Sequence, residues 1–437
     1  MGRVERRLSI TTPIATIFIA ASLLTGCSGG DGTSEATVSS TVATDSSTAP
    51  RRNVDGRLRI GVWLPTSGTA ATLGTPLMTA IDLARREINE AGGVNGELVE
   101  VVARDEGSDP ATAFQSLREL LDQEQVDVVV GPASSRVALS ALETLAEARV
   151  MTCSPTSTAL DLSARRDGGY FVRTIGSEAF EAAALTEAMI VTGSKNFAVL
   201  YPEDDYGLAY ATEMQRAFRR RREDVELVPY DTTLPQFNGP VTAALDAGVQ
   251  VVAVVGTGTV GARVLAALAA NDAPPSEIST FVTSGLRVDN LSALIDPRRP
   301  TASAGIKGVS PTARPVDAMF EADFIESSPG GRMAYAAYAY DCVNLLALAA
   351  QAAGSDDAEK VQAEITSVSA GGSTCRRFGP CAELLADGRS INLNGASGDL
   401  DLQDDGDVGV ADYDVFEYDE QGQDVSTGTI TIRLDSA

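Results

Sequence analysis

Short apolar runs alternate with helical patterns along most of the chain. The clearest runs are Val126–Ser135 and Val150–Thr158, where a valine-containing stretch leads into a turn dense in Gly, Pro and hydroxyl residues. Short buried runs between helical segments are typical of parallel strands. Because the carboxyl ends of parallel strands meet at one edge of a sheet and form its ligand crevice, the two turns should lie together. We expect them to form a binding rim with five hydroxyl residues: Ser134, Ser135, Thr156, Ser157 and Thr158.

The same alternation of strand and helix covers most of the chain after residue 57, and it restarts after Tyr170–Ile175. Besides the two runs above, it predicts strands at Leu58–Leu64, Leu98–Ala103, Tyr170–Ile175, Asn196–Tyr201, Val225–Tyr230, Val249–Val255 and Thr280–Thr283. It predicts helices at about 74–91, Pro110–Gln123, Leu139–Ala148, Glu178–Val191, Leu208–Arg222, Gly239–Ala247, Ala262–Ala270 and Ala334–Gln351. Such alternation predicts an α/β protein with two doubly wound parallel sheets, followed by short strands over 391–434.

The first 27 residues have the parts of a bacterial export signal. Three arginines precede an apolar core, 14–24, that is too short to span a bilayer. The core ends in Leu24–Cys27 (LTGC), which resembles the lipobox of bacterial lipoproteins and implies cleavage before Cys27 with a lipid on its sulfur. An ordinary signal peptide with an incidental cysteine is the alternative. Residues 28–56 are rich in Gly, Ser, Thr and Ala and are interpreted as a disordered tether. We therefore expect attachment to the extracytoplasmic face of the cell membrane.

Composition narrows the possible chemistry. The 437 residues are 44% hydrophobic, enough for two domains with cores, and the net charge of -26 argues against a nucleic-acid partner. The chain has no histidine, which removes Ser-His-Asp catalysis and His-based zinc sites. We assign no catalytic residue and no metal site. Acidic residues near Asp405 resemble a calcium loop only in part, because Gln403 interrupts the ligand spacing.

Residues 256–261 read Gly-Thr-Gly-Thr-Val-Gly, the dinucleotide-binding pattern, and they follow a predicted strand. The next strand ends in Thr283-Ser284-Gly285, without the acid that would bind a ribose hydroxyl. An exported protein also has no dinucleotide pool to draw on. We assign no cofactor and interpret the glycines as letting this loop approach the ligand, with Thr257 as a candidate contact.

Several motifs occur in the order found in one known family. Residues 88–96 (INEAGGVNG) with Arg104-Asp105-Glu106 resemble the signature of type I periplasmic binding proteins, and more narrowly the branched-chain amino-acid binding group of ABC importers. The resemblance covers nearly all of 57–437. The further matching motifs are Gly131-Pro132 with Ser135, Ser154-Pro155 with Thr158, Asp205-Tyr206-Gly207 and Gly395-Ala396-Ser397-Gly398.

The resemblance implies two α/β lobes joined by three crossing segments, near 173–176, 308–311 and 394–402, with a ligand in the cleft between them. The first lobe would comprise 57–174 plus 309–393, and the second 175–308 plus 394–437. Ser135 and Thr158 would hold a ligand carboxylate through their hydroxyls, Thr156 would add a backbone contact, and Tyr206 would close from the second lobe. The alternative for these serines and threonines is capping of their own loops.

One position departs from the family pattern. Amino-acid binders of this family carry an acid for the ligand ammonium in the loop after the later second-lobe strand, where this chain has Gly285 and, nearby, Arg287. Asp204, Asp205 or Asp289 could substitute. Because an unpaired ammonium in a closed cleft costs several kcal/mol, an amide, a carboxylate or another small polar solute is an alternative to an amino acid.

Four cysteines remain after Cys27, an even number in an exported protein. We predict a local disulfide between Cys375 and Cys381. The other two, Cys153 and Cys342, then form a second disulfide or stay as separate buried thiols.

These observations together predict a binding protein and not an enzyme. We expect a lipid-anchored, monomeric solute receptor that delivers a small polar ligand to ABC permease subunits, with the two lobes closing on the ligand. A receptor of the same fold that signals to a membrane partner, and an enzyme of doubly wound fold, are the alternatives.

Overall fold

The computed structural model describes residues 54–68, 70–107, 109–164, 167–246, 248–271, 273–311, 316–331 and 333–434. The predicted export signal, the Cys27 lipidation site and nearly all of the predicted tether lie outside these residues. Among the described helices, none combines the length and apolar character needed to cross a membrane.

The first sheet has five strands, all parallel, in the order β2-β1-β3-β4-β5. Every residue of β3 is buried, as expected where helices cover both faces of a parallel sheet. The strands are β1 (Arg59–Leu64), β2 (Glu100–Asp105), β3 (Val128–Val130), β4 (Met151–Ser154) and β5 (Phe171–Arg173). The helices between them are α1 (Ala71–Glu90), α2 (Pro110–Arg118), which continues as a π-helical turn (Glu119–Gln123), and α3 (Ser135–Ala148).

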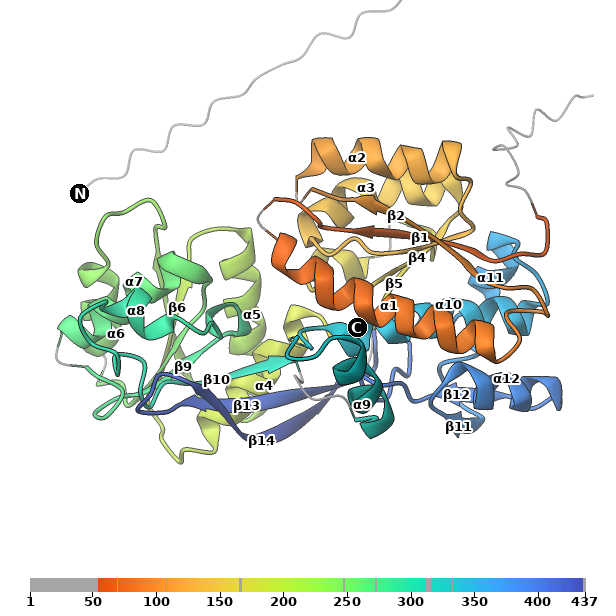
Figure 1. Cartoon of the computed structure of the whole chain (residues 1–437). Coiled ribbons are helices and arrows are strands. Elements are labelled where there is room, and N and C mark those ends of the chain that lie inside the picture. The colour runs from red at the N-terminus through yellow and green to blue at the C-terminus, as the bar shows by residue number, and fades with distance from the viewer. Residues whose placement is uncertain are drawn as a thin grey trace, which may run out of the picture. The chain divides into compact units, whose positions relative to one another are not determined.

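The second sheet has seven strands in the order β14-β13-β10-β9-β8-β6-β7. Five are parallel: β6 (Phe197–Pro202), β7 (Val225–Tyr230), β8 (Val251–Val254), β9 (Ser279–Val282) and β10 (Lys307–Pro311). Their helices are α4 (Glu178–Ile190), α5 (Asp205–Arg220), α6 (Asn238–Asp246), α7 (Gly258–Ala270) and α8 (Leu291–Ile295). The structure thus has the two α/β lobes with parallel sheets that the sequence predicted (Figure 1).

The end of the chain differs from the prediction of short strands. It forms two long antiparallel strands, β13 (Val410–Tyr418) and β14 (Asp424–Arg433), which extend the second sheet beyond β10. The register shifts between Val415 and Phe416. This irregularity breaks the strict alternation of inward and outward side chains, which is why the sequence pattern looked like several short pieces.

After β10 the chain returns to the first lobe. Helix α10 (Ala336–Ala353) packs against α1 and against β3 and β4 of the first sheet. The other elements here are α9 (Ala318–Ser327), α11 (Ala358–Glu364), α12 (Phe378–Ala386) and the small parallel pair β11 (Ser373–Cys375) and β12 (Ile391–Leu393). The chain therefore changes sheets after β5, after β10 and after β12, close to the predicted crossings. The exact residue boundaries of the lobes stay a prediction.

Both predicted disulfides are present. Cys153 in β4 is bonded to Cys342 in α10, with Cα atoms 5.6 Å apart, and Cys375 to Cys381, with Cα atoms 5.4 Å apart. The first fixes the long helix α10 to the strand that carries the second rim loop.

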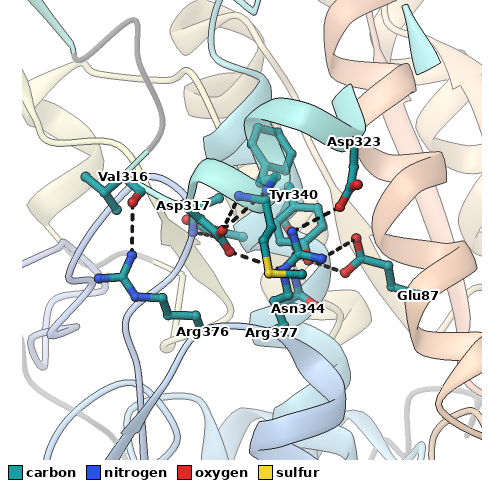
Figure 2. Close-up of polar contacts among 12 residues, drawn as sticks. Glu87, Val316, Asp317, Asp323, Tyr340, Asn344, Arg376 and Arg377 are labelled. Carbon is teal, nitrogen blue, oxygen red and sulfur yellow. Dashed lines mark hydrogen bonds and ion pairs between the residues drawn. The ribbon is translucent and has the colours of Figure 1, made fainter. Parts of the chain in front are cut away.

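An ion cluster around Arg377 holds the chain where it re-enters the first lobe (Figure 2). The Arg377 guanidinium contacts carboxylates of Glu87 in α1 at 3.2 Å, Asp317 at 3.2 Å and Asp323 in α9 at 3.1 Å. The Tyr340 hydroxyl of α10 donates to Glu87. Burial raises the pKa of Glu87 even beside this arginine. The cluster thus ties α1, α9, α10 and the start of α12 together.

A second buried ion pair joins the third crossing to the rim. Arg173, the last residue of β5, is fully buried. Its Nε lies 2.6 Å and its Nη2 2.8 Å from the two carboxylate oxygens of Asp407. Its Nη1 donates to the carbonyls of Ser157 and Ala159 at 3.1 and 3.0 Å. Arg173 therefore holds the second rim loop through two of its carbonyl groups, and Asp407 supplies the counter-charge.

Loss of the buried Arg173–Asp407 ion pair should lower the free energy of unfolding far more than loss of an ion pair on the surface. We expect Asp407→Asn to lower the free energy of unfolding by about 3 kcal/mol, because it leaves a buried guanidinium without a counter-charge. The control is Asp82→Asn, which removes two exposed ion pairs on α1, with Arg85 and Arg86, and should cost less than about 1 kcal/mol. Urea unfolding measures both, and equal losses for the two variants would contradict this role of Arg173.

Candidate functional site

The two rim loops lie side by side, as expected from the parallel pairing of β3 and β4. The amides of Thr158 and Ala159 donate to the Ser135 hydroxyl at 3.0 and 3.3 Å. The Thr156 hydroxyl donates to the Ala133 carbonyl at 2.9 Å. Contacts of this kind along both loops make one continuous rim at the carboxyl edge of the first sheet.

Within this rim the five predicted hydroxyl residues have different surroundings. Ser134 caps α3, which therefore begins at Ser135 and not at the predicted Leu139; the Ser134 hydroxyl accepts from the Val137 amide at 3.4 Å. Ser157 is fully buried and donates to the Pro132 carbonyl at 3.2 Å. The Thr156 amide donates to the Ser154 hydroxyl at 3.4 Å. Ser134, Thr156 and Ser157 thus hold the loops together, the capping role that the sequence left open.

Ser135 and Thr158 are partly exposed and meet where the two loops touch. A serine hydroxyl that accepts hydrogen bonds keeps its own proton for donation. Ser135 at the start of α3 can therefore donate to an additional acceptor, and Thr158 lies beside it. These two residues stay the proposed contacts for a ligand oxygen.

Sequence reasoning missed the part played by Glu106. This residue is fully buried, and its carboxylate accepts from the amides of Ala133 and Ser134 at 2.5 and 3.1 Å. Burial raises the pKa of Glu106 to about 7. The amides of the loop residues directly before α3 are thus already bound by a carboxyl group of the protein. The motif containing Glu106 was visible, but the strand order β2-β1-β3 that brings it to this loop was not.

The predicted second-lobe residues also converge. Tyr206 lies in the first turn of α5, close to the Thr283 side chain. Thr257 precedes α7 and packs against Gly285. A Cβ atom at Gly285 would lie 2.6 Å from Thr257 Cγ2 and 2.8 Å from the Gly256 carbonyl oxygen. An acidic side chain would not fit at this position without moving the loop.

The glycines of the 256–261 loop serve packing within the second lobe. A Cβ at Gly256 would lie 2.8 Å from the Tyr230 hydroxyl, and one at Gly261 would lie 2.7 Å from Leu286. Gly256 and Gly261 therefore serve internal packing, and the approach of this loop to a ligand stays a prediction.

The first turn of α4 links the rim to the second-lobe loop. The Glu178 amide donates to the Thr158 carbonyl at 2.9 Å. The Glu181 carboxylate accepts from the Ser284 amide at 2.6 Å and from the Ser284 hydroxyl at 3.0 Å. Glu178 and Glu181 are only 8% and 6% exposed. One helical turn therefore contacts the loops of both lobes that the sequence assigned to ligand binding.

This turn is electrostatically unusual. Burial raises the pKa of Glu178 to about 7, and the neighbouring Glu181 raises it further than Arg173 lowers it. Burial also raises the pKa of Glu181 to about 7, although Ser284 donates two hydrogen bonds to it. Burial and the charge of Glu181 raise the pKa of Tyr206, so this phenol is a neutral hydrogen-bond donor. The arrangement offers hydroxyl donors and buried carboxyl groups, which suit binding of a small polar molecule.

Comparison with known proteins agrees with this architecture. The sequence model of the family described as periplasmic binding protein matches residues 57–419. The chemotactic signal transduction system substrate-binding protein BasB of Halobacterium salinarum is 28% identical over 361 residues, which cover 78% of this chain and 83% of BasB.

Two solved structures share the fold. The branched-chain amino acid transporter substrate-binding protein LivJ from Streptococcus pneumoniae, in complex with isoleucine, has a TM-score of 0.66 at 19% identity and matches 86% of this chain and 100% of LivJ. An ABC transporter solute-binding protein from R. palustris, in complex with 4-hydroxybenzoate, has a TM-score of 0.64 at 20% identity. The match covers 86% of this chain and 97% of the R. palustris protein. These likenesses confirm the predicted two-lobed fold.

The raised pKa of Glu181 predicts a pH-dependent effect of its neutral isostere. The folded state favours the protonated carboxyl, so its contribution to stability is complete below pH 4.5 and is lost as the pH rises towards 7. Glu181→Gln cannot ionise but keeps an acceptor for Ser284. The unfolding free energy of the variant minus that of the wild type should therefore rise by up to about 3 kcal/mol between pH 4.5 and 8. Urea unfolding across this range measures it, and parallel pH profiles would contradict the burial of this group.

Proposed function

We propose that this chain, which belongs to the type I periplasmic binding proteins of the branched-chain amino-acid binding family, binds a small polar solute between its lobes and delivers it to ABC permease subunits. The family is one of binding proteins, and the site suits that role. Its candidate contacts are hydroxyl groups and buried carboxyl groups on loops of both lobes. Amino acids and small acids are the solute classes suggested by the relatives solved with isoleucine and with 4-hydroxybenzoate.

The observation that carries this proposal is the contact between Ser135 and Thr158, at 3.0 Å between the Thr158 amide and the Ser135 hydroxyl. Two partly exposed hydroxyl residues at one sheet edge can donate together to one carboxylate. Hydrogen bonds to a charged group are worth about 1.5–3 kcal/mol each, so a pair of them is enough to orient a small ligand.

Closure of the lobes is the mechanism we infer. A ligand that contacts both the rim and the Tyr206 region gains interactions in a closed arrangement that it lacks in an open one, so it shifts the population towards closure. The three chain crossings serve as the hinge in this proposal, since hinges are a few residues at the ends of elements. The permease would then recognise the closed form.

Lipid anchoring through Cys27 completes the proposal. The Leu24–Cys27 sequence supports it, and a tether of about 29 residues would reach on the order of 30 Å from the membrane. The protein would act as a monomer at the extracytoplasmic face, within reach of a permease in the same membrane.

A sensing role is the second candidate, and the similarity to BasB favours it. In that case the same lobe closure would be read by a signalling partner in the membrane. Binding of the solute is common to both roles, so the first test concerns the site and not the partner.

Removal of both rim hydroxyls should weaken binding of carboxylate solutes. We expect Ser135→Ala combined with Thr158→Ala to lower the affinity at least tenfold, because the double variant loses two donors to the ligand carboxylate. Titration calorimetry with isoleucine and with 4-hydroxybenzoate measures the effect on whichever solute binds. The control is Ser140→Ala, an exposed serine on α3 whose hydroxyl donates only to the Val137 carbonyl. Unchanged affinity in the double variant would reject Ser135 and Thr158 as ligand contacts.

A further inference from the structure

A cavity of about 300 Å³ lies where the three chain crossings meet, and we call it the crossing cavity. It is lined by Thr174 after β5, by Val316 after β10 and by residues of the segment Asn394–Asp399 after β12. Tyr338 of α10 lines it from the first lobe, and parts of β13 and β14 line it from the second sheet. Small-molecule sites in proteins begin at about this volume. None of the candidate ligand contacts described above lines the crossing cavity, so it is separate from the proposed solute site.

Hydrogen bonds between the crossings hold the walls of this cavity in place. The Thr174 hydroxyl donates to the Tyr338 carbonyl at 2.9 Å. The Val316 amide donates to the Ala396 carbonyl at 2.8 Å, and the Ala396 amide donates to the buried Asp341 carboxylate of α10 at 2.7 Å. A cavity whose walls are already fixed binds a ligand without the cost of ordering loops.

Two oxygen atoms in the walls lack a hydrogen-bond donor. The Oδ1 atoms of Asn394 and Asp399 are buried, and within the part of the chain that the structure describes neither has a partner. The two residues form an antiparallel bridge, and residues opposite each other in such a bridge place their side chains on the same face. Burial raises the pKa of Asp399, and the nearby charge of Arg433 offsets this rise only in part. A ligand with an O–H or N–H group would recover the free energy that buried acceptors without a donor cost.

Two arginines of the same cavity lack a carboxylate partner. Among the described residues, Arg376 and Arg433 form no ion pair, and the Arg376 guanidinium donates to the Val316 carbonyl at 3.1 Å (Figure 2). Arg173 and Arg287, by contrast, contact carboxylates of the chain at 2.6 Å. Guanidinium groups bind carboxylates through strong, charge-assisted hydrogen bonds. A carboxylate supplied by a ligand therefore suits the crossing cavity.

We propose that the crossing cavity is a second binding site, which takes a small carboxylate with an O–H or N–H donor beside its acid group. The two arginines hold the carboxylate, and the free oxygens of Asn394 and Asp399 accept from the donor. Hydroxy acids and amino acids share this chemistry. The inference goes beyond the proposed function and does not depend on it, because neither Ser135 nor Thr158 takes part.

The test compares acids that differ only in the group beside the carboxylate. One trio is lactate, alanine and propionate, and a larger trio is 2-hydroxy-4-methylpentanoate, leucine and 4-methylpentanoate. Calorimetry uses the full-length protein in detergent with Ser135→Ala and Thr158→Ala in place, which suppresses binding at the rim. In at least one trio, the hydroxy acid or the amino acid should bind at least tenfold more tightly than the acid without a donor. The tighter of the two identifies the donor. Equal affinities within both trios, or binding of no member, would overturn the proposal.

Two substitutions separate the ends of the ligand. Arg433→Gln removes a charge that holds the carboxylate, so it should weaken every acid that binds at least tenfold. Asp399→Ala removes an acceptor for the donor group, so it should weaken the donor-bearing acid at least tenfold and the acid without a donor less than threefold. An equal loss for both acids in Asp399→Ala would contradict the role of this oxygen. Unchanged affinities in both variants would place the binding elsewhere and overturn the site.

Arg220→Gln is the matched control, because it removes the charge of an exposed arginine on α5 that does not line the crossing cavity. It should change every affinity less than twofold, and a loss as large as that of Arg433→Gln would mean that only the overall charge matters. Asn394→Ala is the second variant should Asp399→Ala fail to fold, as judged by circular dichroism. It should show the same selective loss of the donor-bearing acid, and the absence of that selectivity would overturn the assignment.

Discussion

The hydrogen bond from the Glu178 amide to the Thr158 carbonyl is the contact on which the site depends. It joins the first turn of the first second-lobe helix to the rim of the first lobe. From the same turn, Glu181 holds Ser284 in the second-lobe loop. The α4 turn therefore contacts both loops, and lobe closure in our account takes place around it.

The distribution of charge in the described residues follows a consistent rule. Arginines near the crossings are neutralised by carboxylates: Arg173 by Asp407, and Arg287 by Asp414 and Asp424. The buried acids Glu106 and Glu181 are instead held by amides and hydroxyls. The protein thus uses its cations for structure and leaves carboxyl groups at the candidate site.

Local pattern was sufficient for the features that depend on neighbours in sequence or on parallel pairing. The alternation of strand and helix predicted both sheets, and the contact of Ser135 with Thr158 followed from adjacent parallel strands. The local Cys375–Cys381 disulfide was predicted, whereas the sequence left Cys153 and Cys342 open as a second disulfide or as separate thiols. Glu106 and Glu181 were missed because each acts on a loop far away in sequence: Glu106 reaches across β1, and Glu181 reaches a loop about 100 residues later. The sequence also could not show why glycine occupies position 285, because this depends on how its loop packs against the loop of Gly256 and Thr257. The long strands β13 and β14 were not recognised in the sequence, because the register shift between Val415 and Phe416 interrupts the alternation of inward and outward side chains.

Closure of two lobes around a solute is the central claim, and a distance between the lobes tests it most directly. Leu139 on α3 and Leu208 on α5 are 37% and 58% exposed and belong to different lobes. Spin labels at Leu139→Cys and Leu208→Cys allow pulsed electron resonance to measure the distance between them with and without a saturating amino acid that calorimetry shows to bind. The account predicts a shorter and narrower distance distribution with the ligand. An unchanged distribution at saturation would contradict it.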